Sequence, residues 1–440
     1  MDWLASLLLL LGLLTILMLA GLPVAFAFLG VNLAGAYIFL GGDAGLGQVA
    51  RNTATSITNF ALTPIPLFVL MGEVLFHTGV AFRAIEAIER LIARVPGRLS
   101  IVSLVGGTMF ATLSGSTMAN TALLGSALLP EMLKRGYHPG IAMGPIMAVG
   151  GIAMLIPPSS LAVLLGSLAG ISISQLLIGG IVPGLLMGLF FLGYVVVRCA
   201  TNPRLAPADD AHEARGWARW RPFVVNVLPL FSIVTVVVGS IIAGWATPTE
   251  SAALGVTASL AAAAAYRALG LRAVMRALYE TAGVSAMIMF ILVASTTFAQ
   301  ILAFSGATDG LLEVAGAVQL SHLSLVIVML LILLFLGCFI DQISMIMITL
   351  PFFVPLAKAA GLDMLWLGVL MLVAMEVSLL TPPFGLLLFV MKGAAPRSIS
   401  MGQVYRAAAP FLLLELLVLA LIVASPALAT WMPSLIRGPV

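Results

Sequence analysis

The sequence contains very little charge. Asp, Glu, Lys and Arg make up only 8% of its 440 residues and hydrophobic residues make up 62%, whereas charged residues average about 25% of soluble domains. Uncharged apolar runs long enough to cross a membrane recur from end to end, which indicates many transmembrane helices. The alternation of period two that marks a membrane β-barrel is absent. We therefore predict an all-α polytopic membrane protein.

Several functional signatures are also missing. No Gly-x-x-x-x-Gly-Lys-Ser/Thr phosphate loop occurs, so an ATP-driven pump is not expected. The two cysteines, Cys199 and Cys338, are far apart and the four histidines are scattered, so neither a redox site, a transition-metal site nor a cofactor is expected. The first residues lack the basic region of a signal peptide, and we expect residues 4–40 to be retained as structure.

Two proline pairs, Pro157-Pro158 and Pro382-Pro383, interrupt apolar stretches of membrane-spanning length. Proline removes a backbone donor and clashes with the preceding turn, so each helix should break there. Unpaired backbone groups are costly in lipid unless they are buried in protein or line a wet cavity. We therefore predict that both breaks face a polar cavity; the alternative is an ordinary proline kink.

The two breaks belong to an internal repeat. At an offset of 225 positions, four of the 12 prolines in residues 1–215 align with another proline. Weak internal symmetry of this kind marks many transporter folds. We therefore divide the chain into a first repeat over 1–197, a cytoplasmic linker over 198–221 and a second repeat over 222–440.

The basic residues set the expected topology. Seventeen of the 20 fall into five clusters, which the positive-inside rule places in the cytoplasm. Connecting these clusters by membrane spans puts the N-terminus outside. Residues 56–82 then run inward across the membrane, whereas about 277–303 run outward, so we predict that the two repeats are inverted. In such folds, solute and coupling ions bind near the membrane midplane. The clusters are Arg83/Arg90/Arg94/Arg98, Lys134/Arg135, Arg198/Arg204/Arg215/Arg219/Arg221, Arg267/Arg272/Arg276 and Lys392/Arg397/Arg406.

Two segments do not fit simple spans. Residues 98–135 run from one basic cluster to another, and their centre is rich in Gly, Ser, Thr and Asn, which break or cap helices. We predict a re-entrant helical hairpin there and a second one at about 323–358. The broken helices follow at about 140–175 and 364–391. Residues 82–98 combine apolar residues at helical spacing with charge, which predicts an amphipathic helix along the interface.

The ordered set of motifs resembles the large membrane subunit of the TRAP (tripartite ATP-independent periplasmic) transporters, the DctM family. The resemblance covers nearly the whole chain. The matching stretches are SGSTMANTALLGSALLPEMLKRGY (114–137), IPPSS (156–160), ATPTESAALG (246–255), FIDQISMIMITLPFFVPLA (339–357) and LLTPPFGLLLFV (379–390).

This resemblance implies sodium-coupled uptake of an organic acid, such as a dicarboxylate, a sialic acid or a sugar acid. It also implies a small four-helix membrane subunit, a periplasmic binding protein that delivers the solute, a location in the bacterial inner membrane, and an ion-transporter-like fold with elevator-type movement. Two departures weaken any transfer of solute identity. The second hairpin reads Asp341-Gln342 where the family often has Asp-Pro, and Ser160-Leu161 replaces a common Ile-Pro.

Sodium and solute are expected at the hairpin tips and helix breaks, where hydroxyl, amide and carbonyl oxygens supply hard ligands and half-helix ends supply dipoles. The alternative for the small residues is close helix packing. The candidates in the first repeat are Ser114, Gly115, Ser116, Thr117, Asn120, Pro157, Pro158, Ser159 and Ser160. Those in the second repeat are Gly337, Asp341, Gln342, Thr381, Pro382, Pro383, Phe384 and Gly385.

Three acids have separate interpretations. Asp341 lies in an apolar region and is either an ion ligand or a helix cap. Glu376 is interpreted as a structural hydrogen-bonding acid, and Glu250 as the cap of the helix after Pro248 rather than as a transport residue. No arginine falls in a predicted span, so a carboxylate solute would be held by helix N-termini, hydroxyls and bound sodium.

Two other functions remain as alternatives. The same fold could act as a stand-alone sodium- or proton-coupled carrier of organic anions that needs no binding protein. An intramembrane enzyme would need Ser116 or Ser159 as a nucleophile, but neither has a histidine or lysine in a nearby predicted span, so an enzyme is not expected.

Overall fold

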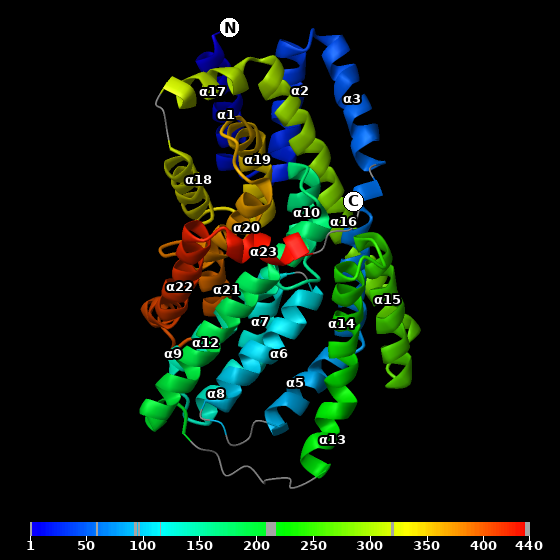
Figure 1. Ribbon diagram of the computed structural model, residues 1–440, viewed down its shortest axis with the longest axis vertical. Coiled ribbons are helices and arrows are strands. Elements are labelled where there is room, and N and C mark those ends of the chain that lie inside the picture. Colours follow the sequence, from blue (N-terminus) through cyan, green and yellow to red (C-terminus); the bar gives the residue numbers. More distant parts are fainter. Residues whose placement is uncertain are drawn as a thin grey trace.

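All regular elements of the described chain are helices (Figure 1), as the composition predicts. The computed structural model describes residues 2–58, 60–91, 95, 97–114, 116–207, 217–317 and 321–435. The first helices are α1 (Trp3–Leu19), α2 (Val24–Phe39), α3 (Asp43–Ile57), α4 (Pro64–His77), α5 (Val80–Leu91), α6 (Arg98–Ser114), α7 (Thr117–Ala127), α8 (Leu129–Lys134), α9 (Pro139–Leu155), α10 (Ser160–Ala169), α11 (Ile173–Gly179) and α12 (Ile181–Thr201). They are followed by α13 (Trp217–Asn226), α14 (Leu228–Ile242), α15 (Pro248–Ala265), α16 (Leu271–Phe304), α17 (Ala307–Ala317), α18 (His322–Leu336), α19 (Gln342–Ala359), α20 (Met364–Leu380), α21 (Leu386–Ala394), α22 (Met401–Ala424) and α23 (Ala427–Leu435).

Several of these helices have the length and apolarity needed to cross a membrane. Among the described residues, four spans qualify: Ile173–Thr201, which combines α11 and α12, and the single helices α16, α19 and α22. Two bent helix pairs, α9 with α10 and Trp220–Asn226 with α14, raise the number to six if each pair is one span. The chain is therefore a multi-pass membrane protein.

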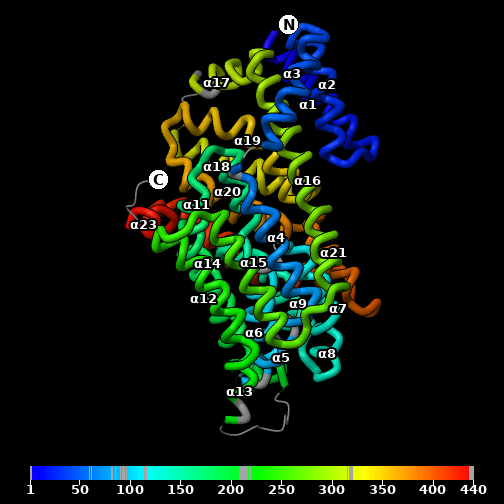
Figure 2. Tube along the Cα trace, turned by 90° about the vertical axis from the view of Figure 1, so that its right-hand side faces the viewer, coloured from blue at the N-terminus to red at the C-terminus, as the bar shows by residue number. Residues whose placement is uncertain are grey.

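The molecule is elongated and has two apolar cores (Figures 1 and 2). Helices α1, α2, α3 and α17 form one end, and α5, α8 and α13 lie at the other. The smaller core packs α1–α3 against α16, α17 and α19. The larger core holds most of the remaining helices together.

Two helices form the centre of the larger core. Every residue of α9 from 141 to 155 is buried, and so is every residue of α20 from 366 to 380. Both helices have 17 residues, and equivalent positions are 225 apart in the chain. These buried helices carry the two proline pairs just beyond their C-terminal ends.

A proline inside α9 is compensated by a neighbouring hydroxyl. Pro145 has no N–H to donate to the carbonyl of Ile141, four residues earlier. The hydroxyl of Ser100, in α6, donates to that carbonyl at 2.7 Å instead, and both groups are buried. The α6–α9 contact therefore supplies the hydrogen bond that the α9 sequence cannot make.

The long helix α16 ties the second half of the chain to the first. The amide of Asn32, in α2, donates to the buried carbonyl of Ala294 at 2.7 Å. Asn52, in α3, donates to the side-chain oxygen of Gln300 at 2.5 Å. Residues 277–303 lie in one continuous helix, but the corresponding 52–78 are split between α3 and α4, where Pro64 begins the second helix.

Helices extend into two of the segments discussed above. In the predicted linker, 198–221, α12 continues to Thr201 and α13 begins at Trp217. Arg198 in the last turn of α12 favours that extension through the helix dipole. Residues 208–216 of the linker lie outside the described chain. The amphipathic segment forms α5, which begins at Val80, but Arg98 starts α6 and residues 92–94 and 96 are not described.

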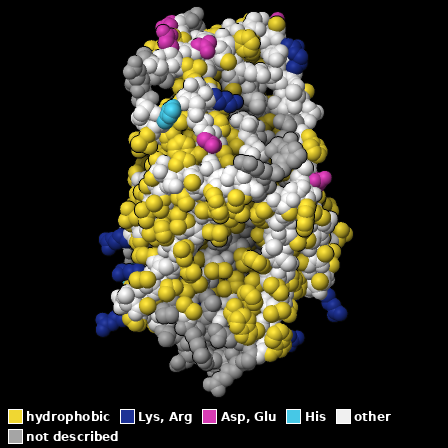
Figure 3. All heavy atoms as spheres, in the orientation of Figure 1, with side chains coloured by type: hydrophobic (Ala, Val, Ile, Leu, Met, Phe, Trp, Pro, Cys, Tyr) yellow, Lys and Arg dark blue, Asp and Glu magenta, His cyan; other side chains and the backbone are white. Residues whose placement is uncertain are grey.

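The surface is broadly apolar and its charges are separated (Figure 3). In this view the visible Lys and Arg side chains lie mostly along the flanks of the lower half, whereas the Asp and Glu side chains lie in the upper half. Large apolar residues are exposed on the outer helices, such as Ile16 in α1 at 63% and Leu413 in α22 at 66%. Such a surface suits contact with lipid or with another membrane protein.

We predict that Ser100→Ala destabilises the protein by about 1–3 kcal/mol, because it leaves the buried Ile141 carbonyl without a partner. Chemical unfolding of the purified chain in detergent would measure this. In a Pro145→Ala background, residue 145 regains its N–H, so the same Ser100 substitution should cost much less. Equal costs in both backgrounds would contradict the compensation.

Candidate functional site

The first proline pair interrupts a buried helix. Helix α9 ends at Leu155, α10 begins at Ser160, and the two axes differ by 45°. The hydroxyl of Ser159 caps α10 by accepting from the backbone N–H of Ala162 at 3.3 Å. Pro157, Pro158 and Ser159 are all buried. The break therefore lies inside the protein, where irregular backbone is tolerated.

A second interruption separates α6 from α7. Helix α6 ends at Ser114 and α7 begins at Thr117; the side chain of Ser114 and the whole of Gly115 lie outside the described structure. Ser116 caps α7 by accepting from the N–H of Ala119 at 3.2 Å. The hydroxyl that sequence reasoning offered as an ion ligand thus satisfies a helix N-terminus.

These two interruptions meet. Thr117 lines the same small crevice as Pro158, Ser159 and Ser160. The accessible space is only about 10 Å³, which is about the volume that a single water needs. The N-termini of α7 and α10 therefore share a space that fits a water or a small ion, but not an organic molecule.

The corresponding tip in the second half is formed by α18 and α19. Asp341 caps α19 by accepting from the N–H groups of Ile343 at 3.1 Å and Ser344 at 3.4 Å, and also from the Ser344 hydroxyl. The capping role weighed for Asp341 is therefore present. Gly337, after α18, lies so close to α20 that a Cβ would fall 1.8 Å from the Ser378 hydroxyl oxygen.

The second proline pair occupies a different environment. Helix α20 ends at Leu380 and α21 begins at Leu386, and Pro382, Pro383 and Phe384 between them are exposed. The hydroxyl of Tyr405 donates to the carbonyl of Pro383 at 2.8 Å.

The residues on either side of the second break contact groups other than those of the first crevice. The Phe384 ring lies 5.6 Å from that of Phe339. The Thr381 hydroxyl donates to the carbonyl of Val377 at 2.8 Å. At Gly385 a Cβ would lie 2.4 Å from the carbonyl oxygen of Leu379, so the backbone folds closely on itself. The described contacts of this break do not include Thr117 or Ser159.

One carboxylate connects the two tips. Glu376, in α20, is buried and accepts from the amide of Gln342 at 2.5 Å and from the hydroxyl of Thr117 at 3.5 Å. Gln342 is the first residue of α19 and Thr117 the first of α7. The interpretation of Glu376 as a hydrogen-bonding acid agrees with these contacts, but its position between two tips could not be read from sequence.

A glycine of α9 lies against Glu376 and Thr117 at this junction. A Cβ on Gly150, in α9, would lie 1.8 Å from Oε1 of Glu376 and 1.9 Å from Cγ2 of Thr117. Only a residue without a side chain allows both groups to approach the helix there. Helices α7, α9, α19 and α20 thus meet around Glu376.

Two polar side chains beside this junction have no partner. Asn120 and Thr121, one turn after Thr117, are fully buried. The amide oxygen and nitrogen of Asn120 and the hydroxyl of Thr121 make no hydrogen bond in the described structure. Buried polar groups normally have a partner, so Asn120 retains the ligand capacity predicted for it.

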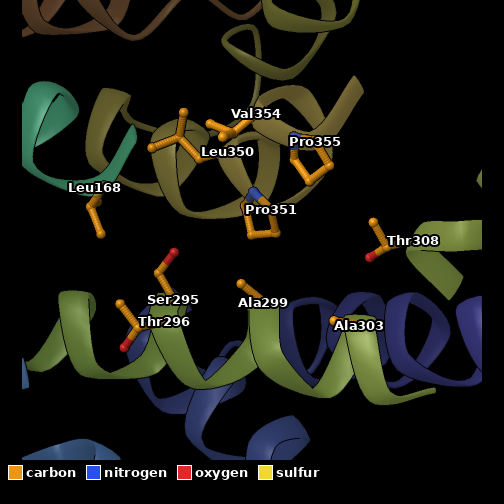
Figure 4. Close-up of a pocket in the computed structure, with 10 residues that line it drawn as sticks. All are labelled: Leu168, Ser295, Thr296, Ala299, Ala303, Thr308, Leu350, Pro351, Val354 and Pro355. Atoms are coloured by element: carbon orange, nitrogen blue, oxygen red, sulfur yellow. The ribbon is translucent and has the colours of Figure 1, made fainter. Parts of the chain in front are cut away.

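A larger cavity lies away from the tips (Figure 4). It has a volume of about 200 Å³ and lies between α16 and the C-terminal half of α19. Leu168, from α10, and Thr308, from α17, close its two ends. None of the predicted site residues lines it, and no sequence signal indicated it, because it arises from helices that are far apart in the chain.

One remaining prediction concerns a helix cap. The Thr247 hydroxyl accepts from the N–H of Glu250 at 3.3 Å, and the Glu250 carboxylate accepts from the N–H of Thr247 at 2.7 Å. This reciprocal capping box confirms Glu250 as a cap. Among the described residues, no group of three His, Cys, Asp or Glu side chains could hold a metal ion.

Comparison with known proteins identifies the family to which this chain is similar. The family model described as "Tripartite ATP-independent periplasmic transporter, DctM component" matches residues 11–428. The chain is 32% identical over 378 residues to the C4-dicarboxylate TRAP transporter large permease protein DctM of Pseudomonas aeruginosa, covering 86% of this chain and 87% of that protein. It is 29% identical over 425 residues to the sialic acid TRAP transporter large permease protein SiaM of Vibrio cholerae, covering 96% and 97%.

A solved transporter shares the fold. The structure of the Alcanivorax borkumensis YdaH transporter superposes with a TM-score of 0.58 and 16% identity, covering 91% of both chains. At this identity the likeness concerns architecture alone. It agrees with an all-helical transporter fold.

We predict that Gly150→Ala destabilises the protein by about 1–3 kcal/mol, the usual cost of inserting a methyl group into a packed interior. Thermal unfolding of the purified chain would detect it as a lower midpoint. Gly283→Ala, in α16, is the matched control, because nothing lies within 4 Å of a Cβ there. An unchanged midpoint for Gly150→Ala would show that the four helices do not meet as described.

Proposed function

The chain belongs to the DctM component family of the tripartite ATP-independent periplasmic transporters, and from this premise we propose that it is the large permease subunit of a sodium-coupled transporter that takes up an organic acid. The observation that carries the proposal is the junction at Glu376, where two helix tips from different halves of the chain meet. Discontinuous helices that meet in this way form the ion and solute sites of many secondary transporters.

The sodium ligands proposed are oxygens near the first tip and break. Asn120 contributes a buried amide oxygen without a partner, and Thr117 and Ser159 border the small crevice. The size of the crevice supports a small ion rather than a solute in this conformation. The C-terminal end of α9 adds carbonyl groups and the negative end of a helix dipole.

The solute proposed is a carboxylate. The N-termini of α7 and α10 both border the crevice, and helix N-termini favour negative charge. The relatives compared above are named for a C4-dicarboxylate and a sialic acid, which supports an organic acid without selecting one. Because the crevice is too small for either, the solute would bind in another conformation.

An elevator movement of inverted repeats is proposed for that conformational change. The matching lengths and 225-residue spacing of α9 and α20 support a repeat. So do α6 and α18, which each precede an interruption followed by a capped helix, α7 and α19. We propose that α6–α10 and α18–α21 move together against the remaining helices.

Partners follow from the same family. We propose a small membrane subunit with four helices, a periplasmic binding protein that delivers the solute, and a location in the bacterial inner membrane with the basic flanks of Figure 3 toward the cytoplasm. The exposed apolar residues of the outer helices support contact with lipid and with the small subunit.

The test is uptake into proteoliposomes that contain this chain and the small subunit encoded beside it. Candidate acids would be supplied under an inward sodium gradient, with and without the neighbouring binding protein. We predict uptake that needs both. Sodium-driven uptake without the binding protein would favour the stand-alone carrier, and flux indifferent to sodium would contradict sodium coupling.

A variant pair makes this test specific to the site. Thr117→Val should lower sodium-driven uptake about two- to tenfold, because it removes a hydroxyl beside the crevice and a hydrogen bond to Glu376 of about 0.5–1.5 kcal/mol. Thr257→Val, in α15, is the control, since its hydroxyl is exposed and bonds only within its own helix. Equal uptake by the two variants would remove Thr117 from the site.

A further inference from the structure

A second buried carboxyl group has no role in the proposed site. Glu415, in α22, is fully buried, and neither of its oxygens has a hydrogen-bond partner in the described structure. It lies against α9, where a Cβ on Gly151 would be 2.8 Å from Oε1 of Glu415 and 2.7 Å from the sulfur of Met187. An unpaired acid in such a place requires an explanation.

No described positive charge reaches Glu415. Helix α22 packs against α9, α12, α20, α21 and α23, and neither α9 nor α23 carries a charged residue. Arg406 lies nine residues earlier in α22, about 13 Å along the axis. Lys392, in α21, donates to the carbonyl of Ile399, before α22 begins. Arg198 lies in the last turn of α12, beyond Tyr194, which meets α22 at Phe411.

The only charged group of α20 within its bounds is another acid. Glu376 lies against Gly150, and Glu415 against the next residue of α9, Gly151, so α20 brings no positive charge to this face of α9. An ionised carboxylate that is buried without a partner costs several kcal/mol or more. The ionised form of Glu415 is therefore strongly disfavoured in this conformation.

Two ligands could neutralise the group, a metal cation or a proton. A hard cation needs several oxygen ligands, but the atoms nearest a Cβ built on Gly151 are the sulfur of Met187 and the Glu415 carboxyl itself, with no second oxygen ligand among them. A proton needs only the carboxyl itself. We propose that Glu415 is a proton-binding site, which takes one proton from water and holds it as a neutral carboxylic acid while α9 and α22 remain packed together.

A consequence for transport rests on the proposed function. If the solute cycle opens the α9–α22 contact to water, Glu415 ionises and releases its proton. Closing the contact would rebind one. Transport would then respond to pH through a residue that is separate from the sodium ligands.

Infrared spectroscopy of the purified full-length chain tests the site without any solute. At neutral pH, the wild type should show the carbonyl-stretch band of a protonated carboxylic acid, and Glu415→Gln should lose the share of that band expected from one carboxyl per chain. Glu313→Gln is the matched control: this residue is exposed on α17, so its loss should remove an ionised carboxylate band instead.

Because a neutral acid can be replaced by a neutral side chain, Glu415→Gln and Glu415→Met should both fold. A protonated band of full intensity in Glu415→Gln would overturn the proposal. Failure of both neutral variants to fold would also overturn it, because that result would mean that the charge is required. Neither outcome depends on the uptake experiment, so the proton site and the proposed function can fail independently.

Discussion

The centre of the molecule depends on one buried carboxylate that must be satisfied by hydrogen bonds. Glu376 accepts from the first residue of α7 and the first residue of α19, whose chain positions are more than 200 residues apart. Both donors reach the same oxygen, Oε2, and a buried polar group that loses its partners costs about 1–3 kcal/mol. The junction therefore holds the N-termini of α7 and α19 at the same site. If one of them moves, either the other moves with it or Glu376 loses a hydrogen bond.

Glycines along α9 make this arrangement possible. Gly144 admits the ring of Phe411, Gly150 admits Glu376 and Thr117, and Gly151 admits Glu415. Helices in lipid associate through close packing of small residues rather than through a hydrophobic driving force. One glycine-rich helix thus brings the site acid, the site hydroxyl and the proposed proton site to its surface, and Pro145 within it is tolerated because Ser100 supplies the missing donor.

Local chemistry in the sequence predicted the helix interruptions, since adjacent prolines and a Gly-Ser tip act on their own backbone. The same holds for the Glu250 cap, which needs only Thr247 three residues earlier. The partners of Glu376 could not be predicted, because Gln342 and Thr117 meet it only through the packing of α7, α19 and α20. Glu415 and the cavity beside α16 were missed for the same reason. The exposure of Pro382 and Pro383 also depends on neighbours that the motif does not encode.

A double-mutant cycle in chemical unfolding tests most directly whether one carboxylate joins the two tips. The cycle compares Thr117→Val, Gln342→Leu and the double variant with the wild type. We expect the loss of stability in the double variant to differ from the sum of the single losses by about 1 kcal/mol or more, because both residues act through Glu376. Single losses that add to within about 0.5 kcal/mol would contradict the account, since residues without a shared partner behave independently.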